Sequence, residues 1–396
     1  MKNESIIENF ISHTDKEFIK KIQNHNFNNL EIFLVGGAVR DILLEKKPKE
    51  LDFCIKGDIK EFINFIDSQI DIKKIKVSEF NTYKLLYNNK YYDFSVTREE
   101  SYIPKGSLPK IDNFNVSIQK DLYRRDFTIN SIAINLYDLK NDFIDPFNGI
   151  KDLENKEIKI IHKDSFNDDP TRIFRAIKFS KRLEFRIEKE SLIELNNSLI
   201  NIKKLSKDRI KNEIEKITHE PKCKEILIEL KKMDALSYFY DFEPSKIKFN
   251  QKNISNWTLI IYSIAMINSF EKKDIISEIN IRKELRKKIN DMVFISKLAK
   301  TNINITKDEF KILKKVDQGS FDDLYHVKEI SSATLDYYRN SLIRSNEHIS
   351  FSEIKKLKSC TNSEASIILN DIQYKKFNDL LKSKKDEMEF VSNYTL

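Results

Sequence analysis

The chain has 396 residues, with 70 Lys and Arg against 62 Asp and Glu, a formal net charge of +8, and 40% hydrophobic residues. This composition excludes a wholly disordered or collagen-like chain, and the length predicts roughly two to four domains. No apolar stretch approaches the roughly 18 residues of a membrane helix, and the first ten residues do not resemble a signal peptide. We therefore expect a soluble, globular, cytoplasmic protein.

The spacing of the cysteines and the net charge narrow the class of protein further. The three cysteines, Cys54, Cys223 and Cys360, lie far apart without CxxC spacing, which argues against disulfides and a structural zinc site. The positive charge is compatible with a nucleic-acid partner, because Lys and Arg neutralise phosphates. A solvated lysine-rich surface is the alternative interpretation.

Glycine and proline divide the chain into two parts. Five of the six glycines and five of the seven prolines fall in the first 170 residues, which predicts a turn-rich part containing strands. The first part is expected to hold strands over 31–35, 51–55, 80–87, 90–96 and 131–137 and helices over 38–44 and 59–70. The strands over 80–87 and 90–96 are expected to form a hairpin around Asn88 and Asn89. We expect helices over 170–184 and 205–217, and more helices from about 222 to 396, without an internal repeat.

The predicted strand over 31–35 ends at Gly36 and Gly37, which open a helix. Backbone N–H groups without side chains around them can hold an anion at a helix N-terminus, and Arg40 and Asp41 follow one turn later. A tight turn without a ligand is the alternative.

Carboxylates follow on the next strands. Glu50 and Asp52 are two residues apart, so we expect both on one face of the sheet, and Asp93 can bring a third carboxylate from the strand over 90–96. Such a set suits Mg²⁺, which prefers oxygen ligands together with substrate phosphates. A solvated strand-end charge is the alternative for Glu50.

The segment DLYRRDFTIN (121–130) places Arg124, Arg125 and Asp126 together before a strand. Alone, it is compatible with a structural arginine pair and a capping Asp. Together with LVGGAVRD (34–41), LDF (51–53), DPFNGIKDL (145–153), DDPTRIFRAIKF (168–179) and LSKDRIKNEIEKI (205–217), it resembles the successive motifs of the tRNA nucleotidyltransferase (CCA-adding enzyme) and poly(A) polymerase family, class II.

The resemblance implies an α+β protein. Its head would have a DNA-polymerase-beta-like nucleotidyltransferase fold with a mixed sheet over residues 1–155. A helical neck for base recognition and RNA contact would follow over 156–220, and a helical body and tail that bind tRNA over 221–396.

The resemblance also implies roles for individual residues. Gly36 and Gly37 would hold the triphosphate, supported by Arg40 and Asp41. Arg125 and Asp126 would recognise the ribose hydroxyl. The catalytic and metal-binding residues would be Glu50, Asp52 and Asp93, with Mg²⁺ as cofactor. The family usually has Asp where this chain has Glu50, so the longer side chain changes the geometry of one ligand.

Asp169 and Arg172 are three residues apart at the start of a helix and can approach one nucleobase together. A carboxylate only accepts hydrogen bonds and a guanidinium only donates them, so the pair suits cytosine and adenine, whose amino groups uracil and guanine replace by a carbonyl. The resemblance assigns this role to the pair and makes Arg175 a nucleotide-binding residue. Arg182 extends a basic stripe on the same helix.

The activity implied is addition of CMP and AMP to the 3′ end of tRNA from CTP and ATP, with release of pyrophosphate. Alternatives are a poly(A) polymerase, an enzyme that adds only CC or only A, and a non-catalytic RNA-binding protein. The segment 78–87 lacks the arginine pair of bacterial poly(A) polymerases, and residues 98–111 lie where the family has a mobile loop for A addition.

Overall fold

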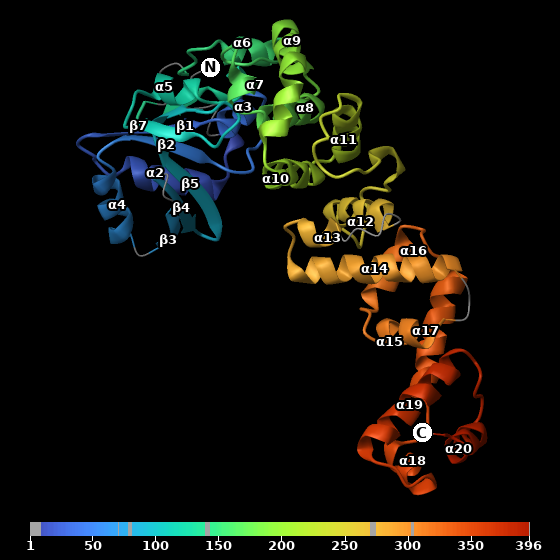
Figure 1. Ribbon diagram of the computed structural model, residues 1–396. Helices are drawn as coiled ribbons and strands as arrows, with labels where there is room; N and C mark the ends of the chain where they lie inside the picture. Colours follow the sequence, from blue (N-terminus) through green and yellow to red (C-terminus); the bar gives the residue numbers. More distant parts are fainter. Residues whose placement is uncertain are drawn as a thin grey trace. The chain divides into compact units, whose positions relative to one another are not determined.

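The computed structural model describes residues 9–69, 71–77, 81–138, 143–269, 275–301 and 305–395. The chain forms two compact units, Met1–Phe239 and Tyr240–Leu396. All strands of the described residues lie in the first unit, and the second is helical (Figure 1). The expected mixed-sheet head with a mostly helical remainder is therefore confirmed, whereas the boundaries near 155 and 220 stay predictions.

The first unit is built on a six-stranded mixed sheet with the order β3-β4-β5-β2-β1-β8. β2 and β5 are parallel, and the other neighbours are antiparallel. The strands are β1 (Leu30–Val35), β2 (Asp52–Gly57), β3 (Ile72–Val77), β4 (Thr82–Tyr87), β5 (Lys90–Val96) and β8 (Ala133–Asn135).

The predicted hairpin around two asparagines is confirmed as β4 and β5. Asn88 and Asn89 have φ values of 46° and 61°. Asparagine adopts this left-handed conformation more readily than most residues, and two in succession match the twist of a two-residue hairpin. Residues 78–80, at the start of the segment compared with poly(A) polymerases, lie outside the described residues.

Two helices cover one face of the sheet, α2 (His13–Gln23) and α4 (Ile59–Ser68). Phe18 of α2 stacks on Tyr92 with ring centroids 3.9 Å apart, and Phe62 of α4 lies 4.9 Å from Phe94. The prediction for 59–70 is confirmed up to Ser68, and residue 70 lies outside the described residues. α2 was not predicted, although Ser12 and Asp15 form a capping box at its start.

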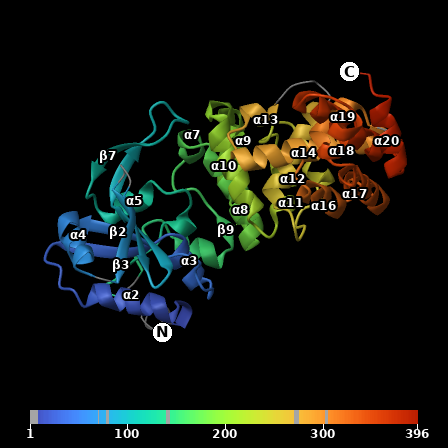
Figure 2. The same cartoon turned by 90° about the horizontal axis from the view of Figure 1, so that it is seen from below.

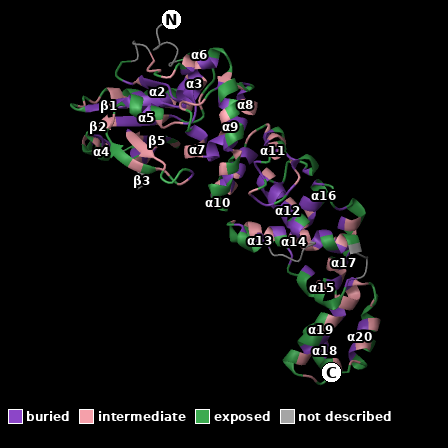
Figure 3. Cartoon of the chain, turned by 45° about the horizontal axis from the view of Figure 1, so that its top comes forward, coloured by how far each residue is buried: buried purple, intermediate pink, exposed green. Residues whose placement is uncertain are grey.

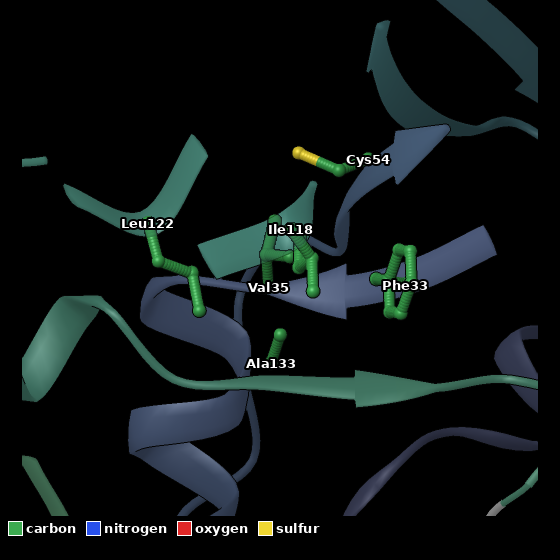
Figure 4. Packing of buried hydrophobic residues seen from close by; sticks show 6 residues of the cluster. All are labelled: Phe33, Val35, Cys54, Ile118, Leu122 and Ala133. Carbon is green, nitrogen blue, oxygen red and sulfur yellow. The ribbon is translucent and has the colours of Figure 1, made fainter. Parts of the chain in front are cut away.

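The opposite face carries a second apolar cluster and α5 (Ile118–Tyr123). Its buried members are shown in Figure 4: Phe33, Val35, Cys54, Ile118, Leu122 and Ala133. Side chains alternate along a strand, so Asp52 lies on the same face as Cys54, and its partner in register, Asp93, lies beside it.

Three predictions differ from the structure of this unit. Glu50 lies in a bend before β2, so strand alternation does not place its carboxylate. The strand expected over 131–137 contains only Ala133–Asn135. A hairpin of β6 (Arg98–Ser101) and β7 (Lys110–Phe114) occupies the segment 98–111, where polar sequence gave no strand signal.

Helices complete the first unit. The expected helices over 170–184 and 205–217 are α8 (Thr171–Leu183) and α10 (Lys207–Thr218), and both α10 and α11 (Cys223–Lys232) pack on α8. Figure 2 shows α8 and α10 side by side. The smaller elements are α3 (Gly37–Leu43), α6 (Gly149–Glu154), β9 (Glu157–Ile158), α7 (Ser165–Asp168), β10 (Arg186–Ile187) and α9 (Lys189–Ser198).

The second unit contains α12 (Asn256–Asn268), α13 (Ile275–Glu278), α14 (Lys283–Thr301), α15 (Lys307–Leu313), α16 (Gly319–His326), α17 (Ser332–Asn346), α18 (Phe351–Leu357), α19 (Asn362–Phe377) and α20 (Lys384–Ser392). Figure 3 shows buried residues along α12 and α14. A separate cluster joins α18, α19 and α20 around Ile354, Ile368 and Val391. Across the described ranges, no helix is long and apolar enough to cross a membrane.

Candidate active site

A cavity of about 570 Å³ opens in the first unit between the sheet and α8. Every predicted site residue except Asp93 lines it. From α3 and the sheet side come Gly36, Gly37, Arg40, Asp41, Glu50, Asp52, Arg125 and Asp126, and from the helical side come Asp169, Arg172 and Arg175. Residues far apart in the sequence therefore meet at one cavity.

The two strand carboxylates lie next to each other, because Asp52 on β2 is in register with Asp93 on the parallel strand β5. Asp93 Oδ2 lies 3.3 Å from Lys84 Nζ, while its Oδ1 is buried without a hydrogen-bond partner. Burial raises the pKa of Asp52, and the negative charges of Asp93 and Glu50 raise it further. Asp93 and Glu50 thus both act electrostatically on Asp52, although only Asp52 and Asp93 lie on strands.

The chemistry of these acids fits a divalent cation that is held partly by substrate. In the part of the chain that the structure describes, no cluster of three His, Cys, Asp or Glu side chains is ready to hold a metal. Mg²⁺, however, is commonly bound by one or two carboxylates together with substrate phosphates. Asp52 would supply one such carboxylate from the cavity wall, and the unpartnered Asp93 oxygen beside it would supply the second.

The turn before α3 requires glycine at its first position. Gly36 has φ +72°, and a Cβ there would lie 2.9 Å from Arg125 Nη1. Its N–H donates to the Ile132 carbonyl at 3.2 Å, so this group is already used within the protein. Gly36 therefore allows the Arg125 guanidinium to lie directly against the turn.

Asp121, which the sequence analysis did not select, holds both arginines of the RRD segment. Its carboxylate accepts from Arg124 Nη2 at 2.9 Å and from Arg125 Nη2 at 3.1 Å. Burial lowers the pKa of Arg125, but the groups around it, among which Asp121 has the largest effect, together raise the pKa above its ordinary value. Arg125 Nε is buried without a partner, so one donor of this fixed guanidinium is unused.

A chain of hydrogen bonds connects α3 to α8 beneath the cavity. Arg40 donates to Asp41 at 2.6 Å and to Asn130 Oδ1 at 2.6 Å, and Asn130 Nδ2 donates to Asp126 Oδ1 at 3.0 Å. Asp126 Oδ2 accepts from Arg175 Nε at 2.7 Å. Burial alone would raise the pKa of Asp126, but Arg175 and Asn130 overcome it and lower the pKa to about 2. Asp126 is thus an ionised structural acid as well as a residue of the cavity wall.

Asp169 is held by an arginine that the sequence analysis did not select. Asp169 Oδ1 accepts from Thr171 Oγ1 at 2.7 Å and from Arg209 Nη2 at 2.8 Å. Arg209 also donates to the Gly106 carbonyl at 2.6 Å, which connects α10 to the β6–β7 connection. The motif that contains Arg209 was recognised, but its partner is distant in the sequence.

Arg172 is fixed by hydrogen bonds to two other segments of the first unit. Its Nη1 donates to Ser165 Oγ at 2.6 Å and its Nη2 to the Arg124 carbonyl at 2.7 Å. The Tyr102 ring lies 5.7 Å from the guanidinium carbon. Asp169 and Arg172 therefore line the same cavity in orientations set by surrounding side chains, as recognition of one base edge requires.

A mixed sheet with paired acids, a glycine turn and an arginine-rich cavity are the features of the nucleotidyltransferase class, whose members move a nucleotide from a triphosphate. Residues 32–159 match the poly A polymerase head domain. The chain belongs to the tRNA nucleotidyltransferase and poly(A) polymerase family.

Two curated relatives carry different names. An A-adding tRNA nucleotidyltransferase of Aquifex aeolicus is 30% identical over 310 residues, covering 72% of this chain and 37% of that protein. A CCA-adding enzyme of Staphylococcus epidermidis is 28% identical over 241 residues, covering 60% of this chain and 58% of that protein. The matches thus span less than two thirds of either relative.

A solved structure, a CCA-adding enzyme in its apo form II, is similar to this chain with a TM-score of 0.69. The two share 22% sequence identity, and the match covers 99% of this chain and 98% of the other. At this level of identity the similarity shows the fold.

Proposed function

We propose that the protein adds CMP and AMP to the 3′ end of tRNA, using CTP and ATP as substrates and Mg²⁺ as cofactor. The names of the relatives from Aquifex aeolicus and Staphylococcus epidermidis support this substrate class. The proposal includes a cytoplasmic location, a helical neck over 156–220 and tRNA binding by residues 221–396.

One observation carries the proposal. A single cavity brings together Asp52, the turn at Gly36, and the base-recognition pair Asp169 and Arg172. Acids beside a glycine turn are found at many sites that bind phosphates. The hydrogen-bond acceptor Asp169 and the donor Arg172, on the helical side of the cavity, would add selection of the nucleotide base. Cytosine and adenine both present an amino group to the acid and a ring nitrogen to the guanidinium, whereas uracil and guanine place a carbonyl against the acid.

In the proposed reaction, the terminal 3′ oxygen of the tRNA attacks the α-phosphorus of the nucleotide. The new bond joins this oxygen to phosphorus, the bond from the α-phosphorus to the bridging oxygen breaks, and pyrophosphate leaves with the electron pair. A divalent cation held by Asp52 and Asp93 would lower the pKa of the attacking hydroxyl and neutralise phosphate charge. Arg125 is positioned by Asp121 beside Gly36, where it can contact the nucleotide.

A second candidate function is addition of the terminal A alone. It is favoured by the name of the Aquifex aeolicus relative, which is an A-adding enzyme. The Asp169 and Arg172 pair accepts both bases and does not separate the two candidates. Poly(A) synthesis and CC-only addition remain as outcomes of the same experiment.

The test uses the purified chain, Mg²⁺ and three tRNAs that end before CCA, after C and after CC. Each nucleoside triphosphate is supplied alone, then CTP with ATP, and the products are sized at single-nucleotide resolution. Completion of all three tRNAs to CCA is the expected result. Action on the CC end alone, with ATP, would identify the A-adding enzyme. Stopping after CC, long A tails, or binding of tRNA without incorporation would contradict the proposal.

A further inference from the structure

Four cations surround one aromatic ring on the α8 side of the cavity. The Phe179 ring centroid lies 5.2 Å from the guanidinium carbon of Arg40 and 5.4 Å from Lys178 Nζ. Arg175 and Arg182 lie at 5.4 Å and 5.8 Å. We call Arg40, Arg175, Lys178 and Arg182 the Phe179 cation cluster. All four line the cavity, so their charges act on whatever enters it.

Three members of the Phe179 cation cluster have acidic partners. Arg40 pairs with Asp41, Arg175 with Asp126, and Arg182 with Glu220 at 3.5 Å. Lys178 differs, because no hydrogen bond or ion pair within the described ranges reaches its ammonium group. The cluster therefore carries one positive charge that the protein does not pair.

The Lys178 side chain is only 7% exposed. Besides Arg175 and Arg182 on its own helix and Arg40 on α3, the charged groups around it are Glu213 and Lys216 of α10 and Glu220 after it. Glu213 is itself paired with Lys216 at 2.6 Å. Burial, with a smaller effect of Arg175, lowers the pKa of Lys178 to about 8. A buried ammonium without a partner destabilises a fold, so packing alone does not explain this residue.

We propose that Lys178, supported by the other three members of the Phe179 cation cluster, binds a phosphate group of a substrate. A phosphate oxygen would accept from the ammonium and supply the missing negative charge, and lysine binds phosphate as a point charge. The inference rests on the proposed function, which offers two sources, the nucleotide triphosphate and the phosphodiester of the tRNA end. Arg40 connects the cluster to the glycine turn, because a Cβ on Gly37 would lie 3.4 Å from Arg40 Nη2.

The test compares Lys178→Met and Lys178→Arg with Lys181→Met. Lys181 lies on the same helix, pairs with Glu229 at 3.5 Å and does not line the cavity, so it controls for loss of a helix charge. Binding is measured without turnover, by calorimetry for inorganic tripolyphosphate and by fluorescence anisotropy for a tRNA that ends before CCA. Each measurement is made at pH 7 and pH 9 after circular dichroism has verified folding.

At pH 7 the Lys178→Met protein should bind one probe about tenfold more weakly than the Lys181→Met control, the loss expected for a charged hydrogen bond. At pH 9 most of this difference should disappear, because a lysine with a pKa of about 8 is then about nine-tenths neutral. Comparison with the control at each pH cancels the titration of the probe itself. The Lys178→Arg protein should bind as the control does at pH 7 and keep that affinity at pH 9.

The probe that responds identifies the source of the phosphate. Weaker binding of tripolyphosphate alone assigns Lys178 to the nucleotide, and weaker binding of tRNA alone assigns it to the primer. Equal affinities of the Lys178→Met and Lys181→Met proteins for both probes at pH 7 would overturn the inference. A protein that binds the probes as expected but incorporates no nucleotide would refute the proposed function and leave the phosphate site intact.

Discussion

The ion pair of Asp126 and Arg175 gives a quantitative prediction for the Asp126→Asn substitution. The pKa of Asp126 is about 2 in the folded protein against a reference of 3.8, a difference of about two units. At about 1.4 kcal/mol per unit, ionised Asp126 contributes about 2 to 3 kcal/mol to the free energy of unfolding. We expect Asp126→Asn to lower that free energy by about 2 to 3 kcal/mol at pH 7.

The pH dependence has a defined sign. Because folding lowers the pKa of Asp126, its contribution is complete above the unfolded pKa of 3.8 and is lost as the pH falls towards 2. The difference between wild type and Asp126→Asn should therefore be constant from pH 5 to 7 and shrink between pH 4 and 2.

The assay is urea unfolding followed by circular dichroism on the full chain, with Arg175→Gln and the double variant completing a cycle. Asp112→Asn on the exposed strand β7 is the matched control and should change the free energy of unfolding by less than about 0.5 kcal/mol. A cycle that gives less than about 0.5 kcal/mol of coupling would refute the proposed energetic role of the pair. A loss of stability that persists unchanged at pH 2 would contradict the assigned pKa.

Three further predictions concern the cavity. Asp52→Ala should abolish nucleotide incorporation and leave tRNA affinity within about twofold in an anisotropy titration, because the carboxylate acts on phosphate chemistry; undiminished turnover would contradict its role. Asp169→Ala should raise UTP and GTP use relative to CTP and ATP by about tenfold or more in single-nucleotide assays, since the acceptor that disfavours a carbonyl is gone; unchanged preference would contradict base recognition. Gly36→Ala should lower the free energy of unfolding by about 1 to 3 kcal/mol, because its φ is +72° and a methyl group would lie 2.9 Å from Arg125 Nη1; denaturation at wild-type urea concentrations would show that the turn relaxes at no cost.

Most strands and turns of the head could be predicted from the sequence, because the signals for them are local. Apolar runs ending at glycine predicted β1 and the turn before α3, and two successive asparagines predicted the β4–β5 hairpin. β6 and β7 were missed because their residues are polar and remain partly or fully exposed, so no apolar alternation marks them. The capping box of Ser12 and Asp15 is the local signal in the sequence for the start of α2.

The candidate site was less readily predicted, because its connections depend on tertiary packing. The residue types around the cavity were recognisable from motifs, but nothing in the segments themselves shows that Arg209 holds Asp169 or that Asp121 holds two arginines. The neighbouring position of Asp93 follows from the parallel pairing of β2 with β5, which strand patterns do not reveal. Lys178 could have been predicted as a further cation of the cavity, since it lies three residues after Arg175 on the same helical face.

The hydrogen bonds of the Asn130 side-chain amide limit which residues can replace it. The amide accepts from the Arg40 guanidinium with its oxygen and donates to the Asp126 carboxylate with its nitrogen, so it passes hydrogen bonding on in one direction from the cation to the anion. An aspartate there would offer acceptors on both sides and set two negative charges against each other, and a leucine would remove one hydrogen bond from each charged neighbour. Deamidation of Asn130, which would convert it to aspartate, would therefore weaken the connection between α3 and α8 at a buried position, without any change at the surface.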